Sequence, residues 1–326
     1  MTAREKFETI EDPRHPSYVE HKLSDILTII MCGMLCGLDT LSGLVIYADG
    51  RSAFLKEHFG IAKIPSKATL SRVLSIVNGA KIASVIIDVM RENIVDFGQV
   101  IAVDGKAIRA TAEKGKPHSA LQILTAYFTE SGVTFGQKTI HEKTNEIPVF
   151  QEMLEYLDVS EKTITADAMH CQKETCKKIV AKKGNYVFGL KENHKNFYDD
   201  IRHYFESGMN CDNIETFESP IENARGRVER RICSKIIDIS CLGNLKEWKG
   251  LKTVFAVRRI VSDKHKTTDE TNYYITSLSE TPEKLLAITR EHWKIENLHW
   301  MLDVVFSEDD CQIQESFQAN IVEKAS

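Results

Sequence analysis

The chain has 326 residues, of which 42% are hydrophobic, and a formal net charge of -5 at pH 7. This length and apolar content predict two or three domains with a substantial core and exclude a disordered protein. Because the chain is acidic overall, it has no bulk positive field, so a nucleic-acid partner has to be held by local basic patches.

Two features predict a protein of the reducing cytoplasm. The most apolar segment, residues 26–38, is too short to cross a bilayer and is interrupted by Gly33 and Gly37, so we expect a buried helix and no membrane partner. The eight cysteines show no paired CxxC spacing and no signal peptide is recognisable before them, which favours free thiols.

The N-terminal part is expected to be helical. Residues 1–20 are polar, carry Pro13 and Pro16, and predict an extended lead-in. Apolar residues then recur at helical spacing over residues 21–98, with breaks near Gly37, Gly60 and Asn78, which predicts a small all-helical domain.

One helix of this domain has the pattern of a DNA-recognition helix. Ser66 can cap it, and polar and apolar residues separate onto two faces. The outward residues are Lys67, Thr69, Ser71 and Arg72, and the inward ones are Leu70, Val73 and Leu74. The pattern resembles a helix-turn-helix, although a plain helical bundle explains it equally well.

From residue 99 the pattern changes to strands. We expect strands at 100–108, 121–128, 133–140, 162–167 and 185–190, and helices at 145–157 and 170–183. This order is that of a ribonuclease-H-like domain, in which the first and fourth strands lie side by side.

The remainder interrupts the α/β alternation and then resumes it. After a helix at 192–206, residues 208–271 alternate as strands do, with candidates at 228–239 and 252–261. A strand at 272–278 and a helix from Pro282, with an inward stripe through His292 and Ile295, follow. The predicted fold class is therefore α/β, a ribonuclease-H-like domain with a β-rich insertion, preceded by a small all-helical domain.

Three acids stand out in this frame. Asp104 lies inside the first apolar strand, Asp167 ends the fourth, and Glu296 borders the inward stripe of the last helix. A carboxylate in a buried strand is costly unless a cation or donors meet it. Taken singly, each has a simpler interpretation: a strand-end Asp caps a loop, and one Glu on a long helix faces solvent.

Four motifs around these acids resemble the bacterial insertion-sequence transposases of the ISAs type, whose relatives include the H-repeat-associated proteins. The motifs are Ile101-Ala102-Val103-Asp104-Gly105-Lys106, Glu142-Lys143-Thr144-Asn145-Glu146-Ile147-Pro148, Thr165-Ala166-Asp167-Ala168-Met169-His170-Cys171-Gln172-Lys173 and His292-Trp293-Lys294-Ile295-Glu296-Asn297. The resemblance runs from about residue 12 to residue 313. It implies a transposase-associated helical domain near residues 10–98, a catalytic domain at 99–326, double-stranded DNA (terminal inverted repeats and target DNA) as partner, a homodimer on paired ends, and a bacterial, nucleoid-associated location.

The chemistry follows from the acids themselves. Three carboxylates can hold two Mg²⁺ ions about 3.5–4 Å apart, one activating water or a 3′-hydroxyl and the other stabilising the departing oxygen. Asp104 would bridge the ions, while Asp167 and Glu296 would each complete one site. Mn²⁺ is expected to substitute for Mg²⁺.

Basic residues near the acids are candidates for DNA contact. They are Lys106 and Arg109 beside Asp104; Lys173, Lys177, Lys178 and Lys182 on the helix after Asp167; and Arg225, Arg227, Arg230 and Arg231 in the insertion. A solvated surface is the alternative interpretation for each of them.

The chain departs from the family pattern near its end. It has one residue fewer between Asn297 and the Leu298-His299-Trp300 element, and residues 316–326 match no motif in place of the family's long C-terminal helix. These departures predict a truncated, weakly active or inactive copy whose activity rises when one residue is inserted after Asn297 and the C-terminal helix is restored. We expect residues Leu298, Trp300, Leu302, Val304 and Val305 to bury against the sheet. The rival interpretations are a stand-alone Mg²⁺-dependent nuclease of the same fold and a non-catalytic DNA-binding remnant.

Overall fold

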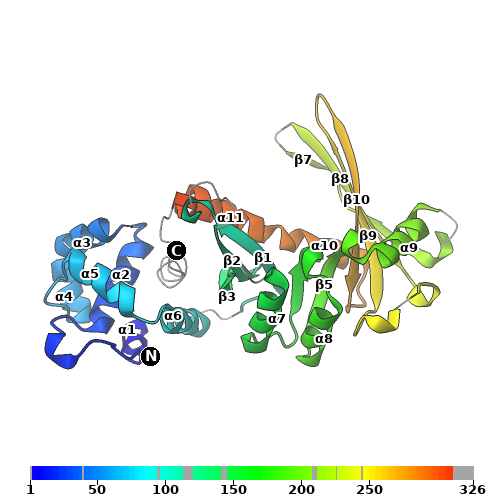
Figure 1. Cartoon of the computed structure of the whole chain (residues 1–326). Helices are drawn as coiled ribbons and strands as arrows, with labels where there is room; N and C mark the ends of the chain where they lie inside the picture. Colours follow the sequence, from blue (N-terminus) through cyan, green and yellow to red (C-terminus); the bar gives the residue numbers. More distant parts are fainter. Residues whose placement is uncertain are drawn as a thin grey trace.

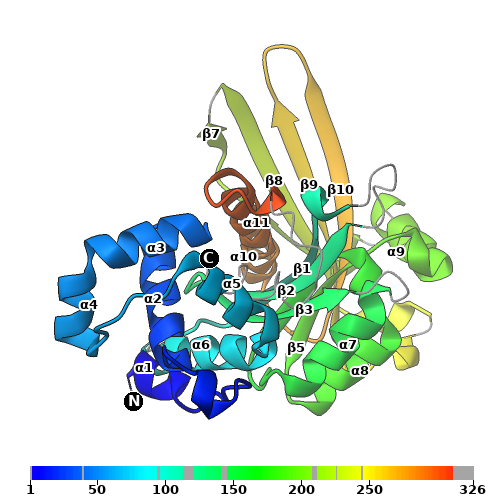
Figure 2. The same cartoon turned by 60° about the vertical axis from the view of Figure 1, so that its left-hand side comes forward.

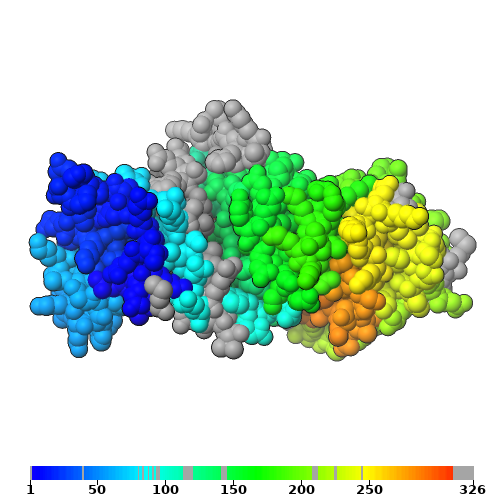
Figure 3. All heavy atoms as spheres, turned by 90° about the horizontal axis from the view of Figure 1, so that it is seen from below, coloured from blue at the N-terminus to red at the C-terminus, as the bar shows by residue number. Residues whose placement is uncertain are grey.

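The computed structural model describes residues 2–38, 40–93, 96–112, 120–140, 145–207, 211–224, 226–243 and 245–310. A lobe of helices lies at one end of an elongated molecule, and a large mixed sheet with its covering helices fills the rest (Figures 1 and 3). Within the described ranges, no helix is long and apolar enough to cross a membrane.

The N-terminal lobe is all-helical, as predicted. Its helices are α1 (Ala3–Phe7), α2 (Leu23–Leu35), α3 (Leu41–Gly50), α4 (Ser52–Phe59), α5 (Lys67–Ile76) and α6 (Gly79–Asn93). The prediction of an extended lead-in was wrong for α1. Thr2 and Glu5 form a reciprocal capping box, which satisfies backbone N–H groups at the start of α1, and Phe7 is buried in the core of the lobe. Both interactions favour a helix over an extended segment here.

Helix α5 has the predicted cap and faces. The Ser66 hydroxyl accepts a hydrogen bond from the Thr69 amide at 3.2 Å. Leu70 and Val73 are buried, while Lys67 and Arg72 are exposed.

The rest of the molecule is built on one mixed sheet. Its strands are β1 (Val100–Ile108), β2 (Leu121–Phe128), β3 (Val133–Ile140), β4 (Thr163–Ala166), β5 (Asn185–Leu190), β6 (Ile214–Glu218), β7 (Glu222–Ala224), β8 (Arg227–Ile236), β9 (Thr253–Ser262) and β10 (Thr267–Thr276). Their order is β3-β2-β1-β4-β5-β10-β9-β8-β6, with β7 pairing β8 off this path. Strands β1 and β4 are parallel neighbours, which confirms the predicted contact between the first and fourth strands.

Helices cover both faces of the sheet (Figures 1 and 2). Helices α7 (Glu146–Tyr156), α8 (Lys173–Ala181) and α9 (Lys195–Glu206) share one core with Ile101, Val103 and Tyr186. Helix α10 (Pro282–His292) packs on the other face, against Val187 of β5. Because side chains alternate along a strand, Asp104 points away from the face that Val103 shares with α7 and toward α10 and α11 (Lys294–Val304).

The β-rich insertion continues the sheet instead of forming a separate unit. Strand β10 begins at Thr267, five residues before the predicted start. It pairs with β9 over its whole length and with β5 only over Tyr273–Thr276. Its outer half, with β7, β8 and the outer half of β9, projects beyond the helices, and we call these projecting strands the arm (Figure 1).

The helix predicted from Pro282 is two helices. Helix α10 ends at His292, and α11 starts at Lys294 after Trp293. The prediction that Trp300, Val304 and Val305 are buried was wrong, because they are 59–62% exposed. Leu298 and Leu302 are buried together with Ile295, at the i, i+3, i+7 spacing of one helix face. Trp300 and Val304 lie off that face, and Val305 follows the last residue of the helix.

Candidate active site

Asp104 and Asp167 come from neighbouring parallel strands. Val103 pairs with Ala166 in the β1–β4 register, so the two aspartates follow paired positions and lie at the same level of the sheet. Burial, and next the charge of Asp167, raise the pKa of Asp104 to about 6. The two carboxylates therefore repel each other across the strand end.

Asp167 is held by the end of α10. His292 Nε2 lies 3.6 Å from Asp167 Oδ1, and the other ring nitrogen of His292 lies 3.1 Å from the Thr165 hydroxyl. The hydrogen bond from His292 lowers the pKa of Asp167. Thr165, on β4, thus orients the imidazole that keeps Asp167 ionised.

Glu296 joins this site from the first turn of α11. Together with Asp167 and His292 it lines a pocket of about 320 Å³, to which β10 contributes Asn272 and Tyr274. Burial, with a contribution from Asp167, raises the pKa of Glu296. The structure therefore brings the three sequence-predicted acids together where β4 ends beside the middle of β1, and the charge of Asp167 acts on both Asp104 and Glu296.

Helix α11 also supplies residues that the sequence interpretation did not assign to the site. His299 Nδ1 lies 3.5 Å from Asp104 Oδ2, and burial with the nearby Lys106 charge lowers the pKa of His299 to about 4. Asp303 lies one turn further and contacts Lys106. The spacing of Glu296, His299 and Asp303 at i, i+3 and i+7 was the available signal, since it places all three on one helix face.

Lys106 is engaged inside the protein. Its side chain is only 10% exposed, and its ammonium pairs with Asp303, at 2.5 Å, and with the buried Glu308. The adjacent candidate Arg109 is 83% exposed and lies 3.5 Å from Asp309. Of the two basic residues predicted beside Asp104, Arg109 is thus the accessible one.

The lysines of α8 lie on the α7 side of the sheet. Lys178 and Lys182 donate to main-chain carbonyls of Gln151 and of Glu155 and Leu157, respectively. Lys173 pairs with Glu247, and Lys177 lies 3.4 Å from Glu174. The predicted cationic stripe is therefore an ion-paired surface, on the opposite side of the sheet from Glu296.

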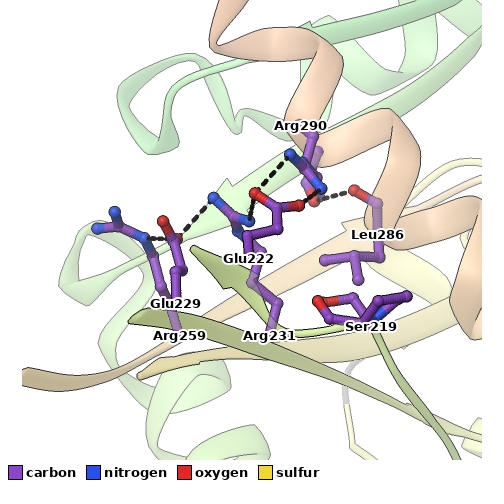
Figure 4. Close-up of polar contacts among 9 residues, drawn as sticks. Ser219, Glu222, Glu229, Arg231, Arg259, Leu286 and Arg290 are labelled. Atoms are coloured by element: carbon purple, nitrogen blue, oxygen red, sulfur yellow. Dashed lines mark hydrogen bonds and ion pairs between the residues drawn. The ribbon is translucent and has the colours of Figure 1, made fainter. Parts of the chain in front are cut away.

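The arginines of the arm form a charged network that reaches α10 (Figure 4). Arg231 bridges Glu222 and Glu229, Arg259 pairs with Glu229, and Arg290 of α10 pairs with Glu222. Separately, Arg230 pairs with Glu218 and Arg227 is exposed, while Arg225 lies outside the described residues. The network ties the arm to the helix that ends beside Asp167.

The donor set suits a hard divalent cation. In the described part of the chain, no three Asp, Glu, His or Cys side chains are close enough to form a ready metal site. Asp104 and Glu296 nevertheless each lie within the electrostatic reach of Asp167, and a bound cation would offset both the burial and the repulsion that raise the pKa of Asp104.

Comparisons with known proteins agree along nearly the whole chain. A family model described as DDE_Tnp_1-associated matches residues 4–90, and one described as Transposase DDE domain matches residues 96–322, which includes most of the segment 316–326 that the motifs leave unmatched. The Escherichia coli K12 protein named "H repeat-associated putative transposase YhhI" is 34% identical over 97% of this chain and 86% of its own length. YncI of Escherichia coli O157:H7, also named as a transposase, is 34% identical over 96% of this chain and 82% of its own length. A solved structure, the piggyBac transposase synaptic complex with hairpin DNA, covers 99% of this chain and 73% of its own with a TM-score of 0.48 and 10% identity.

Proposed function

Because this chain belongs to the transposase DDE domain family, we propose that Asp104, Asp167 and Glu296 are its catalytic carboxylates and that it cleaves and rejoins DNA at the ends of an insertion sequence. The observation that carries the proposal is the neighbourhood of these three acids: Asp167 and Glu296 line one pocket, and burial together with the charge of Asp167 raises the pKa of Asp104. Acids this close are costly for folding alone, which favours a functional reason for them.

The reaction is phosphodiester cleavage followed by strand transfer. A water oxygen bonds to phosphorus while the P–O3′ bond breaks and leaves a 3′-hydroxyl. That hydroxyl then bonds to a target phosphorus while the target P–O3′ bond breaks. Bound Mg²⁺, or Mn²⁺ in its place, would supply activation of the attacking oxygen and stabilisation of the leaving one.

The residues of this chain hold the carboxylates ready for that chemistry. Thr165 and His292 orient Asp167, and His299 of α11 contacts Asp104. Asp104 would bridge the cations, since it lies next to Asp167 and beside α11. His292 and His299 are positioning residues in this account, because they act through the carboxylates.

Double-stranded DNA, both inverted repeat and target, is the proposed substrate, with a homodimer on paired ends. The exposed Arg109 and Arg227 and the outer face of α5 are the accessible cationic surfaces that would meet its phosphates. The arm stands over the pocket, so DNA seated on it would lie beside Asp167.

The test is incubation of a labelled duplex carrying the element's own inverted repeat, with and without Mg²⁺. We expect Mg²⁺-dependent nicking at the repeat boundary, with loss of cleavage but not of DNA binding in Asp104→Asn, Asp167→Asn and Glu296→Gln. Asp200→Asn is a matched control, because Asp200 is exposed on α9, away from the pocket. A variant of the triad that cuts at the parent rate would remove that residue from the site.

The same assay separates the two rivals. Mg²⁺-dependent cutting that ignores the repeat would favour a stand-alone nuclease of this fold. Repeat-specific binding without cutting under any divalent cation would favour a DNA-binding remnant. Joined product, in which the repeat end is linked to target DNA, would identify a transposase.

A further inference from the structure

A fourth carboxylate approaches the site from the other face of the sheet. Glu146 is the first residue of α7, after the Asn145 side chain caps the helix by accepting from the Ile147 amide. Its carboxylate lies against the backbone of Gly105, the residue after Asp104. A Cβ at Gly105 would fall 2.8–2.9 Å from that carboxylate, so glycine is needed here for Glu146 to come so close to the strand.

A buried histidine points at this carboxylate. His170 is 1% exposed, and its Nε2 lies 3.4 Å from Glu146 Oε2. Within the described part of the chain, neither ring nitrogen makes a hydrogen bond, while the ring packs edge-on against Phe150. A buried polar group without hydrogen bonds is costly, so the His170 imidazole is stabilised when the Glu146 carboxylate moves into hydrogen-bond distance of its ring N–H.

Glu146 and His170 belong to the same electrostatic neighbourhood as the catalytic acids. His170 follows Asp167 by three residues, and its charge acts on Asp167. The negative charge of Glu146 acts on Asp104 in the same direction as that of Asp167. The nearest strand cation, Lys106, is already paired with Asp303 and Glu308 on the far face. The middle of β1 therefore has the negative charges of Asp104 on one face and Glu146 on the other, and the Lys106 ammonium is already engaged by two other carboxylates.

We propose that Glu146 is a further ligand for the divalent cation held by Asp104, and that His170 positions the Glu146 carboxylate. This inference rests on the proposed function, because it assumes that Asp104 binds the cation. A carboxylate oxygen is the donor that Mg²⁺ and Mn²⁺ prefer, and a ring N–H of His170 is suited to holding the second oxygen of Glu146 in place. The site would then draw ligands from both faces of the sheet.

Direct cation binding tests the proposal without relying on activity. The probe is Mn²⁺ titrated into the full chain, with free Mn²⁺ measured by electron paramagnetic resonance. Glu146→Gln should weaken Mn²⁺ binding by about tenfold or more, and His170→Asn by a smaller factor. Glu152→Gln is the matched control, because Glu152 is exposed on the same helix and pairs with Lys138, and it should bind Mn²⁺ as the parent does.

The outcomes separate this inference from the proposed function. Parent-like binding in Glu146→Gln with binding lost in Asp104→Asn would overturn the Glu146 assignment and leave the catalytic proposal standing. Equal binding in the parent, Asp104→Asn and Glu146→Gln would overturn both. If Glu146→Gln fails to fold by circular dichroism, Glu146→Asp replaces it, with weakened binding expected and parent-like binding again counting against the proposal.

Discussion

Replacing Asp104 by asparagine should make the metal-free protein more stable at neutral pH. The folded-state pKa of Asp104 is about 6, against 3.8 for an unperturbed aspartate. At pH 7.5 the ionised carboxylate then costs about 3 kcal/mol of folding free energy, from about two pKa units at 1.36 kcal/mol each. The neutral, nearly isosteric amide removes this cost, so the variant should gain at most about 3 kcal/mol in free energy of unfolding.

The direction of the pKa shift determines how the stability gain of Asp104→Asn depends on pH. A carboxyl whose pKa is raised by folding costs nothing below its unfolded pKa, and the cost grows as pH rises from 3.8 to about 6 and then stays constant. The gain of Asp104→Asn should therefore shrink to about 1 kcal/mol at pH 4.5.

Thermal and urea unfolding at the two pH values, in EDTA, measure this effect. We expect the melting temperature of Asp104→Asn to exceed that of the parent by several degrees at pH 7.5 and by much less at pH 4.5, with the exposed Asp200→Asn unchanged at both. Added Mg²⁺ should narrow the gap, because it stabilises only the parent. A variant less stable than the parent at pH 7.5, or a gain independent of pH, would refute the account of Asp104 as a repelled, buried carboxylate.

Four further outcomes follow from the described contacts. Lys106→Met should lower the free energy of unfolding in urea by about 3–5 kcal/mol, because it leaves the carboxylates of Asp303 and Glu308 without their cation. The double variant Lys106→Met/Glu308→Gln should recover part of this loss, and Lys63→Met, at an exposed lysine, is the control. Lost DNA affinity at unchanged stability would instead make Lys106 the phosphate contact that the sequence suggests. Ser66→Ala should cost about 1 kcal/mol in the same assay, and no change would mean that the cap of α5 contributes nothing. Replacing Lys177, Lys178 and Lys182 together by glutamine should leave the salt dependence of DNA binding unchanged, because these side chains are engaged on the opposite side of the sheet. A slope flattened by about 0.9 in log–log units for each lysine would instead place the DNA phosphates on α8. Inserting one alanine after Asn297 should lower the melting temperature, because it turns His299 and Asp303 away from β1 by about 100° around the helix axis. A rise in both stability and cleavage would instead support the spacing of the family pattern, which has one more residue after this asparagine.

Local pattern predicted the elements that carry the acids. The strand at 100–108 and the hairpin of 121–128 and 133–140 have the predicted bounds, because their apolar runs and the turn between them are local signals. The fold class and the family followed from the same runs and motifs. Asp104 and Asp167 could be placed together because adjacent parallel strands end at one edge of a sheet.

Contacts between distant segments were beyond reach of the sequence alone. The partner of Lys106, Glu308, lies 202 residues further along the chain, so a basic residue beside an acid was interpreted as a DNA contact. The break at Trp293 is invisible to periodicity, since both helices keep the same spacing of apolar residues on either side. The approach of Glu146 to Gly105 depends on how α7 crosses the sheet, which no local pattern encodes.

Strand β10 gives the arm and the pocket a shared mechanical element. Its residues Asn272 and Tyr274 form a wall of the carboxylate pocket, while its first residues pair with β9 at the far end of the arm. One uninterrupted strand, paired with β9 over its whole length, therefore connects the tip of the arm to the pocket wall (Figure 1). The β5–β10 pairing over Tyr273–Thr276 anchors the inner end of this strand in the sheet, next to the wall that Asn272 and Tyr274 form.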